Sequence, residues 1–160
     1  LSVEEILSQG WVASALQERK ARQAELNQAI SQNLEVVDRL AIVRMENAGM
    51  RSNGYRITAI AGDACDACVV VHGDVGASFG DEDVYPVSAS FYTNSFLHTE
   101  GGLYDLTQLA TRFDPDGGGH ANACGCRIQP LDGGKRVERK VEIDDIDRNL
   151  EVWLGMWAER

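Results

Sequence analysis

The stretch that decides the fold is residues 103–127, which reads LYDLTQLATRFDPDGGGHANACGCR. Its first half has a helix pattern, because Asp105 is a preferred N-cap residue and apolar side chains then recur at steps of three and four. Its second half alternates small and polar residues in the manner of a strand. The stretch therefore predicts a helix at residues 105–113, a glycine bend, and a strand at about 121–128.

The glycine run is the segment with the clearest chemistry. Gly117, Gly118 and Gly119 are followed directly by His120, and Asn122 completes this candidate phosphate site. Glycines tolerate positive φ and carry no side chain, so successive backbone N–H groups in such a bend can face one anion. A His beside them can donate a ring N–H, and a nearby anion favours its protonated form. The alternative is an ordinary helix-to-strand loop with a capping glycine and a surface His.

This stretch resembles the signature of the DHH-associated domain of DHH-family phosphoesterases, in which a capped helix leads into a GGGHxxAAGF loop. The matching residues are Asp105, Leu109, Ala110 and Phe113 in the helix, and Gly117, Gly118, Gly119, His120, Ala123 and Gly125 in the loop. The resemblance extends more loosely upstream to about Tyr55. The flanking segments at both ends of the chain lie outside the motif.

The resemblance implies the domain that closes over the substrate in RecJ-like exonucleases, oligoribonucleases and cyclic-dinucleotide phosphodiesterases. The glycine loop and its His would hold a phosphate of a short oligonucleotide or nucleotide. A partner DHH domain would hold two manganese ions, which activate water and stabilise both oxygens of the displacement. This chain has only His72, His98 and His120, and no Asp-His-His triplet. We therefore expect neither catalytic residues nor a cofactor in this chain, and a DHH domain as its partner.

One departure from the family concerns the strand before the capped helix, where an Arg-Ser pair is common. The corresponding residues here are Ala89-Ser90-Phe91-Tyr92-Thr93-Asn94-Ser95, without an Arg. Asn94, Ser95 and Arg127 are therefore candidates for secondary contacts with the substrate. His98 is a further candidate, with an exposed loop His as the alternative.

The four cysteines allow a different kind of site. They occur as Cys65 and Cys68 in a CxxC pattern and as Cys124 and Cys126 in a tighter CxC pattern. Four thiolates can hold zinc or an iron–sulfur cluster. The alternative is that all four are small buried hydrophobes, since each pair adjoins or lies within a predicted strand.

The remaining chain predicts an α+β, or mixed α/β, domain with a small central sheet and flanking helices. Ser2 and Glu5 form a capping-box pattern, and a long helix should run from about Trp11 into the forties. Strands are expected at residues 55–61, 67–72 and 84–93, a hairpin turn within residues 129–140 that contains Asp132-Gly133-Gly134, and a closing helix from about Asp144. This divides the chain into a helical arm at 1–53, a substrate-binding domain at 54–141 and a C-terminal helix at 142–160.

Composition limits the partners. A formal charge of −10 and a pI near 4.7 disfavour broad binding to long nucleic acid or to an anionic membrane, so a phosphate must be held locally. No apolar run is long enough to span a bilayer and no signal peptide opens the chain, so we expect a cytoplasmic protein. Because the chain starts at Leu1, directly before a helix signal, we expect a fragment of a longer polypeptide. The alternative function is a regulatory or oligomerisation domain, in which the long helix forms a homodimer.

Overall fold

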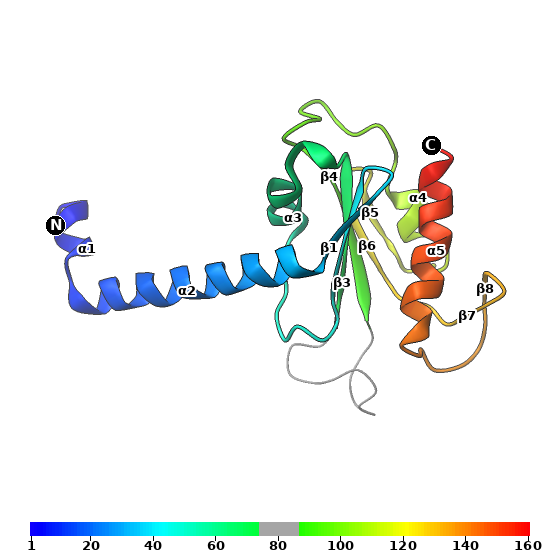
Figure 1. Ribbon diagram of the computed structural model, residues 1–160, viewed down its shortest axis with the longest axis horizontal. Helices are drawn as coiled ribbons and strands as arrows, with labels where there is room; N and C mark the ends of the chain where they lie inside the picture. Colours follow the sequence, from blue (N-terminus) through cyan, green and yellow to red (C-terminus); the bar gives the residue numbers. More distant parts are fainter. Residues whose placement is uncertain (74–86) are drawn as a thin grey trace.

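A mixed sheet of six strands forms the centre of the computed structural model, which describes residues 1–73 and 87–160 (Figure 1). The strand order is β1-β2-β3-β4-β6-β5, and all neighbours are antiparallel except β2 and β3. The strands are β1 (Leu34–Val37), β2 (Leu40–Met45), β3 (Ala67–His72), β4 (Ser88–Thr93), β5 (Gly118–His120) and β6 (Ala123–Arg127). The expected mixed α/β fold with a small central sheet is confirmed.

Helices cover both faces of this sheet, and one of them extends far beyond it (Figure 1). One face is covered by α3 (Gly54–Ala61) and by the end of the long α2 (Gly10–Asn33), and the other by α4 (Thr107–Ala110) and α5 (Asp144–Ala158). The short α1 (Val3–Leu7) stands at the far end of α2. A single 3₁₀ turn (Gly62–Ala64) follows α3, and a hairpin of β7 (Leu131–Asp132) and β8 (Lys135–Arg136) precedes α5.

The core has two layers, one on each face of the sheet. Alternate residues of β3 enter different layers, because successive side chains of a strand point to opposite faces: Val69 and Val71 pack with α5, whereas Cys68 and Val70 pack with α3. Every residue of β3 is buried, as expected for a central strand that is covered on both sides. Trp153 of α5 anchors its layer through an edge-on contact with Phe91, with ring centroids 5.0 Å apart.

The predicted long helix ends earlier than expected. Its capping box at Ser2 and Glu5 is confirmed, but α2 stops at Asn33 and residues 34–45 form β1 and β2 instead of helix. The turn between these strands places Asp38 and Arg39 at positive φ, 48° and 66°. Strand pairing with the distant β3 decides the structure here, and the β-branched residues Val36, Val37, Ile42 and Val43 favour strands.

The predicted strand at residues 55–61 is wrong, because these residues form α3. The side chain of Asn53 caps this helix by accepting a hydrogen bond from the backbone N–H of Arg56 at 3.1 Å. Ile57 is fully buried, while Tyr55 is half exposed. In so short a stretch alternation and helical spacing overlap, and the N-cap was the deciding signal.

The other predicted elements agree with the structure, with shorter bounds. The helix expected at residues 105–113 is regular only in α4, although its apolar residues Leu106, Leu109, Ala110 and Phe113 are all buried. Gly133 and Gly134, at φ 56° and 76°, confirm the hairpin turn, and α5 confirms the closing helix. The strand expected from residue 84 begins at Ser88, and residues 84–86 lie outside the described part. Among the described residues, no helix is both long and apolar enough to cross a membrane.

Candidate functional site

The glycine run is the last strand of the sheet rather than a loop. β5 pairs with β6 on one side only, with Gly118 opposite Gly125 and His120 opposite Ala123. Gly118 and Gly119 have φ values of 150° and 137°, which residues with side chains rarely adopt. A Cβ on Gly119 would lie 2.7 Å from the carbonyl oxygen of Ala123, and a Cβ on Gly117 would overlap the carbonyl oxygen of Ala110. The glycines are therefore required by the backbone.

Beside β5, the sheet has a face that helix α3 leaves partly uncovered, and we call it the open face. Residues that are paired directly across strands point to the same side of a sheet. Three such rows make up the open face: Ser88 with Arg127; Ser90 with Gly125 and Gly118; and Tyr92 with Ala123 and His120. α3 contacts β2, β3 and β4. None of the residues in the three rows is fully buried, and most have small side chains.

His120 is the exposed functional group at one end of this face, and Asn122 follows it at the β5–β6 turn. The amide oxygen of Asn122 accepts hydrogen bonds from the hydroxyl of Thr93 and from the backbone N–H of Gly102, both at 2.9 Å. Asn122 therefore ties the turn to the end of β4 and to the loop after it. Its NH₂ group is the part that remains for a ligand.

Arg127 lies on the same face as His120 but at its other end. The two residues are separated by four positions along β6, or roughly 13 Å at the usual rise of a strand. The backbone N–H of Arg127 donates to the buried carboxylate of Asp114 at 2.8 Å, and this carboxylate also accepts from the N–H of Asp116. Arg127 can thus add positive charge to the open face, but not next to His120.

Two of the three candidates after β4, Asn94 and His98, bond to residues directly before β3 and not to the glycine strand. Asn94 is fully buried, and its NH₂ group donates to the carbonyls of Gly62 and Cys65 at 3.0 and 2.9 Å. Asn94 is therefore a structural residue. Ser95 is exposed, and His98 is held with its Nε2 2.9 Å from a carboxylate oxygen of Asp66.

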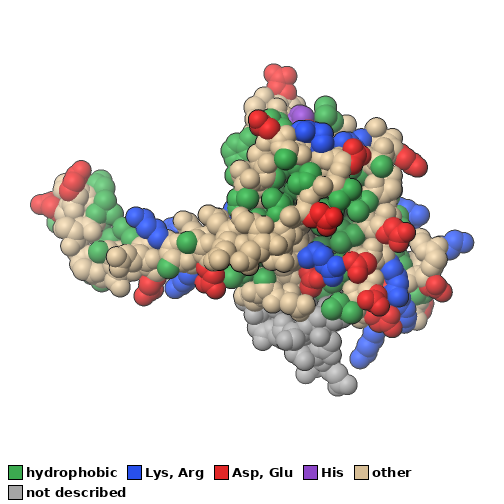
Figure 2. Space-filling view, viewed as in Figure 1, with side chains coloured by type: hydrophobic (Ala, Val, Ile, Leu, Met, Phe, Trp, Pro, Cys, Tyr) green, Lys and Arg blue, Asp and Glu red, His purple; other side chains and the backbone are tan. Residues whose placement is uncertain are grey.

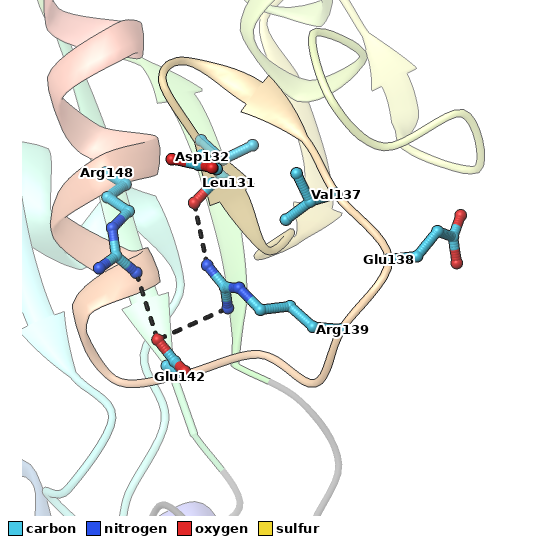
Figure 3. A pocket seen from close by; sticks show the side chains of 7 residues that line it. All are labelled: Leu131, Asp132, Val137, Glu138, Arg139, Glu142 and Arg148. Carbon is cyan, nitrogen blue, oxygen red and sulfur yellow. Dashed lines mark hydrogen bonds and ion pairs between the residues drawn. The ribbon is translucent and has the colours of Figure 1, made fainter.

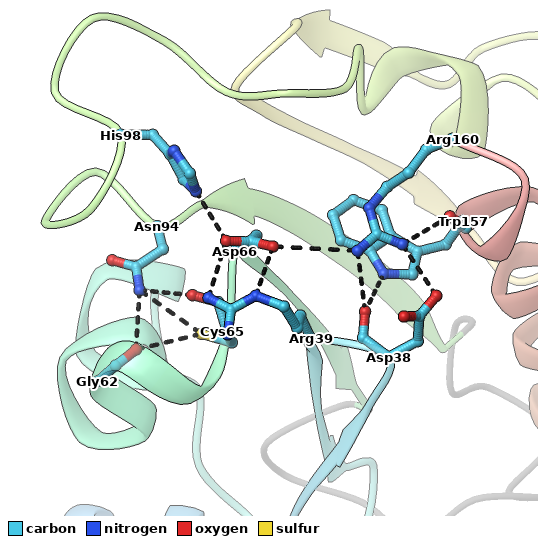
Figure 4. A network of polar contacts seen from close by, with 9 residues as sticks. All are labelled: Asp38, Arg39, Gly62, Cys65, Asp66, Asn94, His98, Trp157 and Arg160. Carbon is cyan, nitrogen blue, oxygen red and sulfur yellow. Dashed lines mark hydrogen bonds and ion pairs between the residues drawn. The ribbon is translucent and has the colours of Figure 1, made fainter.

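Asp66 is the centre of a polar network that the sequence did not reveal (Figure 4). Arg39 donates to its two carboxylate oxygens from Nε at 2.7 Å and from Nη2 at 2.9 Å. This guanidinium, together with His98, lowers the pKa of Asp66 to about 2 against the opposing effect of burial. Nearby, Arg160 donates to the Asp38 carboxylate at 3.0 Å. The network joins the β1–β2 turn, the start of β3, the loop after β4 and the C-terminal residues. The sequence signal that could have pointed to Asp66 is an acidic residue directly before an apolar strand.

The four cysteines are not brought together. Cys65 and Cys68 lie in the core layer under α3, and Cys124 and Cys126 lie in the layer under α5, on the opposite face of the sheet. Burial raises the pKa of the Cys124 thiol to about 12. Across residues 1–73 and 87–160, no three His, Cys, Asp or Glu side chains gather in a way that could hold a metal ion.

A separate hollow of about 410 Å³ lies between the β7–β8 hairpin and α5 (Figure 3). Its arginines are committed to a buried carboxylate, since Arg139 and Arg148 contact Asp145 at 2.7 and 3.0 Å. Burial alone would raise the pKa of Asp145, but hydrogen bonds, first from Arg139, hold it well below its usual range. This network anchors the hairpin, and its paired charges make the hollow a poor anion site.

The comparisons with known proteins concern the fold alone. No family model matches the sequence, and no curated protein matches it. In structure, the chain is similar to the pGpG-specific phosphodiesterase PggH from Vibrio cholerae, with a TM-score of 0.68 and 16% identity over 97% of this chain and 45% of that one. An exopolyphosphatase-related protein from Bacteroides fragilis has a TM-score of 0.45 and 14% identity, over 83% of this chain and 35% of that one. The chain spans less than half the length of either protein.

Proposed function

We propose that this chain is the substrate-binding domain of a DHH-family phosphoesterase and binds a phosphate of a short oligonucleotide, a cyclic dinucleotide or a related phosphoester. The observation that carries the proposal is the exposed His120 at the end of a glycine strand, at the edge of the sheet and on its open face. The motif in residues 103–127 and the fold shared with a phosphodiesterase support the same assignment.

The binding chemistry follows from what the glycine strand offers. Backbone N–H groups and the His120 ring can donate to phosphate oxygens, and the missing side chain of Gly118, which faces open space, lets an anion come close to the backbone. The chain carries a net charge of −10, and the face seen in Figure 2 mixes acidic and basic side chains without a broad basic surface. A phosphate would therefore be recognised by hydrogen-bond donors close to it rather than by long-range electrostatic attraction.

Hydrolysis belongs to a second domain in this proposal. The manganese pair of the family would be held by a DHH domain outside this chain, because the described residues bring no set of metal ligands together. That domain would supply the activated water. The residues of this chain would bind the phosphoester and orient it, so we expect the isolated chain to bind without hydrolysing.

Titration calorimetry with the dinucleotide pGpG tests the proposal. Charge-assisted hydrogen bonds are worth about 1.5–3 kcal/mol, so His120→Ala should weaken binding at least tenfold. It should leave thermal unfolding unchanged, because the side chain is exposed. Gln108→Ala, an exposed change on α4, serves as the control and should bind like the unmodified chain. Equal affinities for His120→Ala and the unmodified chain would remove the glycine strand from the proposed site.

A further inference from the structure

Two tyrosines form an aromatic wall beside the candidate phosphate site. The ring of Tyr55, on α3, tilts against the ring of Tyr92, on β4, with centroids 5.7 Å apart and an interplanar angle of 55°. Tyr92 is fixed from behind, because α3 approaches so closely that a Cβ on Gly54 would overlap its ring. Tyr55 remains 52% exposed and belongs to neither core layer. Core packing therefore explains part of the position of Tyr92, but it does not explain why an aromatic ring is present at Tyr55.

Between this wall and His120, the row across the strands carries one small side chain. Tyr92, Ala123 and His120 form one row across three strands, so the outer two are separated by roughly 10 Å, two strand spacings. The residue between them in this row is Ala123, whose side chain is a single methyl group. Aromatic rings pack with centroids about 4.5–7 Å apart, so a planar ring against Tyr92 would lie over Ala123 and next to His120.

The adjoining row across the strands, which we call the floor, also has small side chains or none. Ser90, Gly125 and Gly118 form the adjoining row, and a Cβ on Gly118 would meet no atom of the described residues within 4 Å. A ligand that places a phosphate at the glycine strand can thus lay a flat group on the sheet without displacing any of these residues.

We propose that the open face binds a nucleobase against the Tyr55–Tyr92 wall, so that this site prefers nucleotides to phosphate compounds that lack a base. The inference rests on the proposed phosphate site and names its ligand class. Every base has a π face and can stack, so the wall selects for a base without selecting strongly among bases. Selection of one base over another requires hydrogen bonds to base edges, and the small residues of the floor offer few.

The test compares ligands that share a phosphate and differ in the base. The full 160-residue chain is titrated with pGpG, with ribose 5-phosphate and with inorganic tripolyphosphate. We expect pGpG to bind at least tenfold more tightly than either compound without a base. Tyr55→Ala should lower the affinity for pGpG about tenfold, from the loss of one stacking surface, and leave that for ribose 5-phosphate unchanged. Tyr55→Phe keeps the ring and should bind like the unmodified chain.

A control variant and a second measurement make the outcome decisive. Phe96→Ala removes another exposed aromatic ring, 64% exposed on the loop after β4, and should not change pGpG binding. Tyr55 is the residue to change because its exposure leaves folding intact; thermal unfolding of each variant verifies this. Unchanged pGpG affinity in Tyr55→Ala, or equal affinities of the unmodified chain for pGpG and ribose 5-phosphate, would overturn the inference while the phosphate site stands. If no phosphate compound binds, the proposed function fails and the inference fails with it.

Discussion

Asp66 and His72 are buried ionisable side chains at opposite ends of β3, and they respond to pH in different ranges. Arg39 holds Asp66 in its charged form and lowers its pKa to about 2. His72 is 4% exposed, and burial, reinforced by the nearby Arg51, lowers its pKa below 6.5. Its Nε2 contacts Ser52, whereas its buried Nδ1 has no partner among residues 1–73 and 87–160. A depressed pKa means that the folded state favours the charged carboxylate in one case and the neutral imidazole in the other.

Replacing Asp66 should reveal the ion pair as a pH-dependent contribution. A pKa of about 2 against a usual value of 3.8 corresponds to about 2 kcal/mol at pH 7. We expect Asp66→Asn to lower the free energy of unfolding by about that amount at pH 7. The difference should shrink as the pH falls from about 4 towards 2, where the wild-type carboxylate becomes protonated. Urea unfolding across this range measures it, with Asp63→Asn, an exposed neighbour, as control. A cost that does not change with pH would assign the effect to packing.

His72 should make the fold less stable as the pH falls below about 6.5. The unfolded chain then takes up a proton that the folded chain resists, so protons favour unfolding until the folded-state pKa is reached. His72→Gln removes this group, and its melting temperature should fall less between pH 7.5 and pH 5 than that of the unmodified chain. Gln108→Ala, an exposed change that removes no ionisable group, should keep the original slope. Parallel slopes in all three proteins would show that His72 does not titrate in this window.

At the scale of elements, the glycine strand is held by the sheet on one side and by the α4 loop on the other. Gly119 packs its backbone against Ala123 and Cys124 of β6, and Gly117 approaches Ala110 of α4. Gly118, in contrast, faces open space. The segment 117–119 combines φ values at Gly118 and Gly119 that residues with side chains rarely adopt with a tight fit at Gly117 and Gly119, which keeps its N–H groups in a fixed arrangement.

This difference predicts unequal effects of two similar substitutions. Gly118→Ala introduces a side chain at φ 150° but meets no neighbour, and should cost about 1 kcal/mol. Gly119→Ala adds contacts of 2.7 and 2.8 Å with the β6 backbone, so we expect at least twice that loss and separation of β5 from β6. Urea unfolding gives the two costs, and pGpG titration shows whether the site survives. A larger cost at Gly118 would contradict the register described for β5 and β6.

At the scale of the whole molecule, the N-terminal helices α1 and α2, which we call the arm, are nearly independent of the body. α1 has no buried residue, and α2 has one, Ile30, near its end (Figures 1 and 2). Leu26 packs partly against the core under α3, and Arg56 of α3 donates to Asn27 at 2.9 Å. The outer part of the arm stabilises nothing in the body through contacts between described residues.

Truncation of the arm should therefore have two distinct outcomes. Removing residues 1–20 should leave the melting temperature within about 3 °C and pGpG binding unchanged, because no buried contact is lost. Removing residues 1–33 also removes Ile30 and should cost about 2–5 kcal/mol, as for a large-to-small change in a core. Circular dichroism on heating distinguishes the two. Sedimentation of the full chain and of the variant without residues 1–20 tests the alternative of a dimer formed by the arm. If the full chain sediments with the mass of one chain at all concentrations, this dimer is excluded.

The sequence by itself determined the features that depend on neighbouring residues: the capping box at Ser2, the Gly133–Gly134 turn, α5, and the candidate glycine segment with His120. Each is set by local backbone preferences or by a motif of consecutive residues. Only the tertiary structure decided that residues 34–45 are strands, that β5 is an edge strand, and that Tyr92 faces His120 across Ala123. The same holds for Asp66, whose partners Arg39 and His98 are distant in sequence. The physical reason is that strand pairing and buried ion pairs gain their free energy from partners far along the chain, and no local sequence pattern identifies these partner residues.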